Sequence, residues 1–149
     1  MRKIVAHNKK ARYDYEILET LVAGIELKGH EVKSIRQGKI SIKEAHARLI
    51  NNQVFLLGAN ITQYKQHADQ NYDPIRTRKL LLHRQEINRL IGKIKEKGLA
   101  LVPLSVFLQN HKLVKVELAL GKGKKQYDKR ESLKKKELDR KLKSRFGKI

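Results

Sequence analysis

Residues 44–61 read EAHARLINNQVFLLGANI, and no other stretch indicates the fold so clearly. Its two halves, 44–50 and 53–61, are apolar segments rich in residues that favour strands. Asn51 and Asn52 join them, and asparagine is one of the few residues that tolerate the positive φ of a tight turn. The stretch therefore predicts a β-hairpin.

Further apolar runs on both sides of the hairpin extend the β pattern. Residues 15–28 are rich in Ile, Leu and Val, and Gly24 inside them predicts a bent strand with a bulge, because glycine is costly inside a helix. Residues 99–109 and 112–120 predict two more strands. Pro103 indicates an edge position or a bulge, since proline cannot donate to a sheet ladder. The total is about five or six strands.

Two helices are predicted within the same region. Residues 30–38 place Val32 and Ile35 three apart, which indicates a short amphipathic helix that ends at Gly38. A longer helix is predicted before Gly98, where apolar residues recur at i, i+3, i+4 and i+7. These residues are Ile87, Leu90, Ile91 and Ile94.

The predicted fold class is mainly β, an OB-like, partly open antiparallel barrel of six strands with two or three helices. Residues 1–120 form the predicted body, and 1–12 within it form a basic arm. The polar stretch 62–74 is predicted to be a surface loop, and Leu80 to Leu82 are assigned to the core. Residues 121–149 form a basic C-terminal tail.

Composition limits the classes of partner. The 149 residues hold 35 Lys and Arg against 15 Asp and Glu, a net charge of +20, which indicates a polyanion partner. Nucleic acid is the first candidate and an anionic membrane the rival. The absence of cysteine excludes disulfides, Cys-ligated zinc and thiol catalysis, and the six His show no metal-ligand spacing. No signal peptide or run of 18 apolar residues is found, so a cytoplasmic protein without a membrane span is expected.

The charge falls into two parts. Residues 121–149 hold 13 Lys or Arg and four acidic residues, a net +9, and the body holds the other +11. Such a tail cannot bury enough apolar surface to fold alone, so it is predicted to be disordered in the free protein. Leu138, Leu142 and Phe146 recur every four residues, which predicts a helix that forms on a charge-neutralising partner.

Five motifs carry a resemblance to a known family. In chain order they are NKKA (8–11), GHEVKSIR (29–36), GANI (58–61), RTRKLLL (76–82) and GKGKKQYDKR (121–130). From about Asn8 to the end, the chain resembles the small protein B family, the bacterial partners of transfer-messenger RNA. Basic runs are common, so the ordered set rather than any single motif carries the resemblance.

The resemblance implies a non-enzymatic adaptor. It implies a barrel that binds the tRNA-like domain of transfer-messenger RNA (SsrA RNA) and delivers it to the vacant A site of stalled ribosomes. The tail would fold as a helix in the empty mRNA path, against small-subunit rRNA. A translation elongation GTPase would take part through the alanyl-tmRNA complex. Tyr127 stands where some members have His, so imidazole proton chemistry is not expected at this position.

The candidate RNA-binding residues of the body are mostly cations. Lys33 and Arg36 share one helical face and suit phosphate contacts, although a solvated basic face is the simpler alternative. Glu31 lies among cations, where it either accepts hydrogen bonds from bases or forms an intramolecular salt bridge. The full set is Asn8, Lys9, Lys10, Glu31, Lys33, Arg36, Arg76, Arg78 and Lys79.

In the tail, Tyr127 offers an aromatic ring that can stack on an rRNA base, with cations around it. The predicted ribosome-contacting residues are Lys122, Lys124, Lys125, Tyr127, Asp128, Lys129 and Arg130. Aromatic content is only 5%, so the body is expected to recognise RNA mainly by shape and phosphate contacts.

Three other hypotheses fit parts of the sequence. A ribosomal or ribosome-assembly protein also pairs a small β body with basic extensions. A nuclease would use Glu31, Asp14 and a His, but these form no recognisable acid–base or metal constellation. A membrane-surface protein would use 131–148 as an interfacial helix, whose apolar face is thin and lacks Trp. No catalytic residue, metal or cofactor is predicted.

Overall fold

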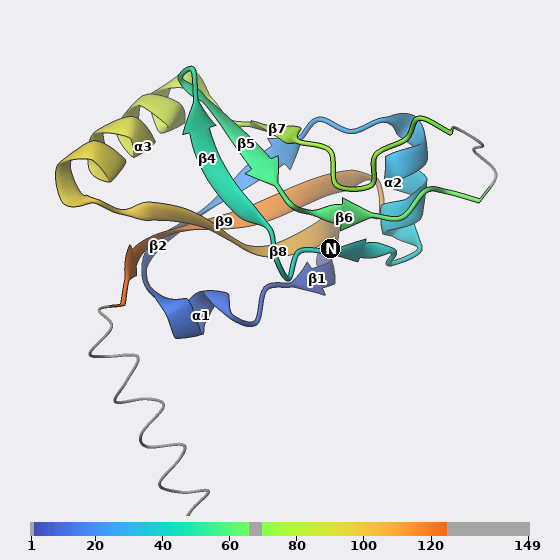
Figure 1. Cartoon of the computed structure of the whole chain (residues 1–149), viewed down its shortest axis with the longest axis horizontal. Coiled ribbons are helices and arrows are strands. Elements are labelled where there is room, and N and C mark those ends of the chain that lie inside the picture. Colours follow the sequence, from blue (N-terminus) through green and yellow to red (C-terminus); the bar gives the residue numbers. More distant parts are fainter. Residues whose placement is uncertain (1, 66–69, 125–149) are drawn as a thin grey trace, which may run out of the picture.

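The computed structural model describes residues 2–65 and 70–124, and within them it shows nine strands and three helices (Figure 1). The strands are β1 (Arg2–His7), β2 (Tyr15–Ile25), β3 (Ile40–Ser41), β4 (His46–Ile50), β5 (Gln53–Leu57), β6 (Asn60–Ile61), β7 (Arg78–Leu81), β8 (Ala100–Gln109) and β9 (Leu113–Gly123). The helices are α1 (Ala11–Asp14), α2 (Gly29–Arg36) and α3 (Arg84–Lys97). In this part of the chain no helix is long and apolar enough to cross a membrane.

One large antiparallel sheet dominates the molecule. Its seven strands run in the order β1-β8-β9-β2-β7-β5-β4, and β3 pairs with β6 in a small second sheet. The predicted mainly β class is therefore confirmed. The strand count exceeds six because β1, β3 and β7 join the strands that the sequence predicted, and because residues 53–61 divide into β5 and β6.

The predicted hairpin is confirmed as β4 and β5. Asn51 and Asn52 occupy its turn with φ of 52° and 61°. Gly58 ends β5 with φ of 77°, and a Cβ there would lie 2.8 Å from the Glu44 carbonyl oxygen, so only glycine fits. This turn separates β5 from β6.

The bulges lie where neighbouring strands shift register. In β2 the shift falls between Ile17 and Glu19, so the predicted long strand with a bulge is confirmed, with the bulge several residues before Gly24. In β8 the shift falls between Pro103 and Ser105, which confirms a bulge there. Strand β8 lies between β1 and β9, but β1 pairs only with residues 105–109, so Pro103 has a ladder partner on the β9 side alone and the predicted edge position holds locally.

The N-terminal segment is an ordered part of the sheet rather than a loose arm. Residues 2–7 form β1, which pairs with β8 along the edge of the large sheet. Arg2 lies over the ring of Phe107, 4.0 Å from its centroid. Backbone pairing with β8 and this cation–π contact fix a segment whose own sequence is only weakly apolar.

Helices α3 and α2 lie toward opposite ends of the molecule (Figure 1). The prediction of α3 is confirmed: the His83 N–H donates to the Glu86 carboxylate at its start, and Ile87 and Leu90 are buried in the main core. The prediction of α2 is also confirmed. Its Ile35 is fully buried against Ile61 and Leu108 in a smaller cluster. The two helices thus bury apolar side chains at both ends of the curled sheet.

The body extends beyond the boundary that the sequence predicted after Leu120. Strand β9 continues to Gly123, pairing residues 121–123 with 15–17 of β2. The Lys124 N–H then donates to the Asp14 carbonyl at 3.1 Å. Residues 121–123, which the sequence assigned to the tail, therefore belong to the sheet, and Lys124 is bonded to the segment before β2.

This boundary is testable by truncation. A chain that ends at Leu120 lacks the ladder between 121–123 and β2, so its free energy of unfolding should fall by about 2 kcal/mol. A chain that ends at Lys124 should unfold like the full-length protein. Urea titration followed by circular dichroism measures both, and equal stability of the two truncated chains would contradict the assignment.

Candidate nucleic-acid interface

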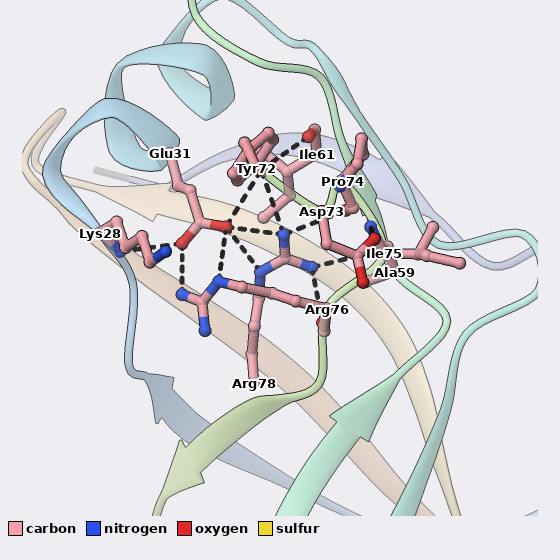
Figure 2. A network of polar contacts seen from close by, with 10 residues as sticks. All are labelled: Lys28, Glu31, Ala59, Ile61, Tyr72, Asp73, Pro74, Ile75, Arg76 and Arg78. Carbon is pink, nitrogen blue, oxygen red and sulfur yellow. Dashed lines mark hydrogen bonds and ion pairs between the residues drawn. The ribbon is translucent and has the colours of Figure 1, made fainter. Parts of the chain in front are cut away.

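A buried ion network joins α2 to the segment that enters β7 (Figure 2). Glu31 Oε1 accepts hydrogen bonds from the Lys28 N–H at 2.8 Å and from Arg76 Nη2 at 2.5 Å. Glu31 Oε2 accepts from Arg78 Nη2 at 2.6 Å and lies 3.1 Å from the Tyr72 hydroxyl oxygen. The side chains of Glu31 and Arg78 are 0% exposed. The carboxylate is thus sealed inside the protein with both oxygens in use.

Arg78 completes the network with its remaining N–H groups. They donate to the backbone carbonyls of Ala59, Pro74 and Arg76 at 2.9, 3.0 and 3.1 Å. The Tyr72 hydroxyl lies 2.8 Å from the Ile61 carbonyl oxygen, to which it donates. One guanidinium therefore ties together α2, the start of β6 and the segment before β7, which is how a buried cation is stabilised.

The network keeps Glu31 ionised. Burial alone raises the pKa of Glu31, but hydrogen bonds from Arg76, from the Lys28 N–H and from Arg78 outweigh it and lower the pKa to about 2. Burial and the negative charge of Glu31 raise the pKa of Tyr72 to about 12. The phenol is therefore neutral and the carboxylate charged at any physiological pH.

These positions change the roles assigned to two predicted RNA-binding residues. Glu31 and Arg78 were predicted to contact RNA, but both are sealed from solvent and from any ligand. The intramolecular salt bridge, the alternative for Glu31, is what the structure shows. In the structure both side chains lie in the protein interior, where they hold α2 against the segment before β7.

The neighbours of Arg78 divide between core and surface. Arg76 remains 26% exposed while paired with Glu31. Along β7, Leu80 points into the core and Lys79 points outward. Leu81 is 48% exposed, so its assignment to the core is wrong: strand alternation turns it to the solvent side with Lys79.

The predicted N-terminal residues also differ in role. The Asn8 amide Nδ2 donates to the Pro103 carbonyl at 3.1 Å, and the Asn8 N–H donates to the Leu104 carbonyl at 2.9 Å. Asn8 therefore anchors the chain to β8. Lys9 and Lys10 are exposed beside it and available to a polyanion.

On α2, Lys33 and Arg36 are both exposed and lie on the accessible side of the helix, as the helical spacing predicted. Lys33 Nζ lies 5.5 Å from the centroid of the Tyr64 ring. At the chain end, Lys122 is exposed and Lys124 Nζ lies 6.0 Å from the Tyr13 ring. The segment predicted to be disordered and to form a helix lies outside the described residues. So do the remaining predicted tail residues, which are Lys125, Tyr127, Asp128, Lys129 and Arg130.

A surface that the sequence did not reveal spans five strands. Sheet register makes Ile4, Phe107, Lys115, Gly24 and Leu81 successive cross-strand neighbours on β1, β8, β9, β2 and β7. A second row runs parallel to the first on β1, β8, β9 and β2. We call these two rows the outer face; the second contains His7, Ser105, Glu117 and Val22.

Two hollows meet in the middle of the outer face because Gly24 has no side chain. One, of about 460 Å³, extends toward Val22, and the other, of about 250 Å³, extends toward Leu113; both are lined by Gly24, Leu81 and Lys115. A Cβ at Gly24 would lie 3.3 Å from the Leu81 Cβ, which is tight. The smaller hollow combines apolar side chains with Lys112 and Lys115, which suits a ligand with flat faces and negative charge such as nucleic acid, whereas the larger one also contains Glu86.

Among residues 2–65 and 70–124, the groups that the nuclease hypothesis requires do not come together. The nuclease hypothesis needs Glu31 and Asp14 together, but α2 and α1 lie apart in the fold and Glu31 is sealed (Figure 1). Within residues 2–65 and 70–124 no group of three His, Asp or Glu is placed to hold a metal ion.

The curled antiparallel sheet, the excess of cations and the outer face together define a basic, OB-like protein of the nucleic-acid-binding class. A family model described as SmpB protein matches residues 5–148. The chain belongs to this family.

Similar proteins agree over nearly the whole length. The chain is 54% identical over 140 residues to the SsrA-binding protein of Thermosipho melanesiensis, covering 94% of this chain and 95% of that protein. It is 54% identical over 149 residues to the SsrA-binding protein of Acetivibrio thermocellus, covering 97% and 96%. A solved structure described as "tmRNA-SmpB: a journey to the center of the bacterial ribosome" contains a chain that matches with a TM-score of 0.64 and 48% identity, covering 80% of this chain and 84% of that one.

The ion network predicts a pH dependence of stability. The folded-state pKa of Glu31 is lowered from 4.5 to about 2, so its contribution is complete above about pH 4.5 and disappears as the pH falls toward 2. This contribution is about 3 kcal/mol. Glu31→Gln should remove this part of the pH dependence and lower stability at pH 7 by about 3 to 5 kcal/mol, because Arg78 stays buried without its partner.

Urea unfolding of wild type and E31Q between pH 2 and 7 measures both effects. Glu96→Gln on the exposed side of α3 is the matched control and should keep the wild-type profile. Parallel profiles for wild type and E31Q would show that Glu31 is not the group responsible.

Proposed function

We propose that this chain binds the tRNA-like domain of transfer-messenger RNA, the SsrA RNA, and delivers it to the A site of stalled ribosomes during trans-translation. The observation that carries the proposal is the extent of the family match, which runs to residue 148. It covers both the described body and the basic segment beyond Lys124. A protein that binds one RNA while it enters a ribosome needs two polyanion-binding parts.

The body supplies the first part. Residues 1–124 carry a net charge of +13, and the outer face adds apolar contact area next to Lys115. A folded RNA is recognised mainly by the shape of its backbone and by its unstacked bases, so a shaped, mostly rigid surface suits it. Lys9, Lys10, Lys33 and Arg36 add further accessible cations to the body.

The tail supplies the second part. Residues 125–149, beyond the end of β9, carry a net charge of +7, and in our proposal they occupy the vacant decoding site and mRNA path of the small subunit. The residues assigned to this contact are Lys122, Lys124, Lys125, Tyr127, Asp128, Lys129 and Arg130. An elongation GTPase joins the assembly through alanyl-tmRNA.

In this role the protein is an adaptor that acts in the cytoplasm, where ribosomes work. It catalyses no reaction of its own and needs no cofactor. It acts by binding alone, with one part of the chain on the RNA and the other on the ribosome.

Truncation after Lys124 separates the two parts. The shortened chain keeps the whole sheet, so it should bind the tRNA-like RNA within about threefold of the full-length affinity. It should fail to support tagging of nascent chains on stalled ribosomes in a reconstituted translation system. Equal loss of RNA binding and tagging would contradict the division of labour.

The outer face is tested through Lys115. Lys115→Gln should weaken binding to the tRNA-like RNA and lower the slope of log affinity against log salt by about one unit for each phosphate that is no longer neutralised. Lys97→Gln, at the far end of α3, is the matched control. Filter binding over a series of salt concentrations measures both, and an unchanged slope for K115Q would remove Lys115 from the interface.

A further inference from the structure

A row of three side chains crosses β4, β5 and β7, the strands at the edge of the large sheet opposite β1. Arg48 on β4 is the direct cross-strand partner of Phe55 on β5, and Phe55 is the partner of Lys79 on β7. The residues on either side of Phe55 are Val54 and Leu56, and both are fully buried in the core. Strand alternation therefore places Arg48, Phe55 and Lys79 together on the solvent side, with the aromatic ring between two cations.

The ring is available rather than consumed by packing. Phe55 is half-buried, and it belongs to none of the buried clusters formed by the described residues. The cation–π contacts within residues 2–65 and 70–124 involve Arg2, Lys33 and Lys124, so neither Arg48 nor Lys79 covers its face.

The two cations are available as well. Neither forms an ion pair with an acidic residue in the described part of the chain. Glu26, directly after β2, donates its backbone N–H to the Lys79 carbonyl, and β2 lies on the side of β7 away from β5 and Phe55. Two cations without an acidic partner, with an aromatic ring between them, attract a ligand that is both flat and anionic.

We propose that Arg48, Phe55 and Lys79 form a stacking platform for one unpaired nucleobase of the bound RNA. The base stacks on Phe55, and the phosphates on either side of it contact Arg48 and Lys79. The base must be unpaired and unstacked, because both faces of a base inside a helix are already covered by its neighbours.

The platform adjoins the outer face. Lys79 and Leu81 point outward from the same strand, β7, two residues apart. A strand of RNA that leaves the hollow beside Leu81 therefore meets Lys79 and then Phe55. The inference rests on the proposed function, since it assumes that the body binds RNA, and it adds a specific contact with a single-stranded nucleotide.

The chain contains no tryptophan, so Phe55→Trp in the full-length protein introduces a single fluorescent reporter at the platform. A short oligoadenylate strand and the tRNA-like RNA should both quench the F55W emission, whereas a blunt RNA duplex should quench it much less. Leu18→Trp, at an exposed position of β2, is the matched control and should respond little to the oligoadenylate. Equal quenching of F55W and L18W would overturn the platform.

Affinity gives a second readout. Phe55→Leu keeps an apolar side chain on β5 but removes the stacking surface, so affinity for the tRNA-like RNA should fall about tenfold with the salt slope unchanged. F55W should bind like wild type. Arg48→Gln should weaken binding and lower the slope by about one unit.

Failure of the stacking platform and failure of the proposed function give different results. If F55L and wild type bind the tRNA-like RNA equally and F55W is not quenched, the platform is refuted while RNA binding by the body stands. If wild type itself does not prefer the tRNA-like RNA over a duplex of equal length, the proposed function fails. Should F55L lose stability in a thermal melt, the F55W quenching decides.

Discussion

The ion network centred on Glu31 and Arg78 is the constraint on which the α2 side of the molecule depends. A chain with a net charge of +20 is poor in carboxylates, yet one of them is placed where no solvent reaches it. A buried guanidinium without a partner would cost several kcal/mol, so the pair forms only when both segments arrive together. Because 47 residues separate Glu31 from Arg78, their contact fixes α2 against β7 and so sets the direction in which Lys33 and Arg36 face.

Local features were predictable from the sequence because their causes are local. The hairpin follows from Asn51 and Asn52, and α3 follows from apolar spacing that needs no knowledge of the rest of the chain. Strand β1 was not predictable, since residues 2–7 are held by pairing with β8 about 100 positions later. The position of the β2 bulge was not predictable either, because it depends on the register with the distant strand β9. Gly24 lines a hollow on the outer face.

The candidate site shows the same limit. A sequence reveals which residues are charged, but not which of them have found partners. Lys33, Arg36 and Lys79 face outward as their spacing indicated, whereas Glu31 and Arg78 neutralise each other out of reach. The outer face and the Phe55 platform both arise from cross-strand register, and register depends on the whole sheet. The sequence feature closest to the outer face is Gly24, a glycine inside a strand; it predicts a bend, and in the structure it lines both hollows.

Strand β9 also acts as a spacer of fixed length. It carries Lys115 on the outer face and ends at Gly123, next to the point where the tail departs. The strand rises about 3.4 Å per residue, so the two points are roughly 27 Å apart. Pairing with β2 and β8 on both sides keeps this span from stretching or folding back. In the proposed function, an RNA bound beside Lys115 therefore lies at a fixed distance from Gly123, and this distance links the RNA contact to the start of the tail.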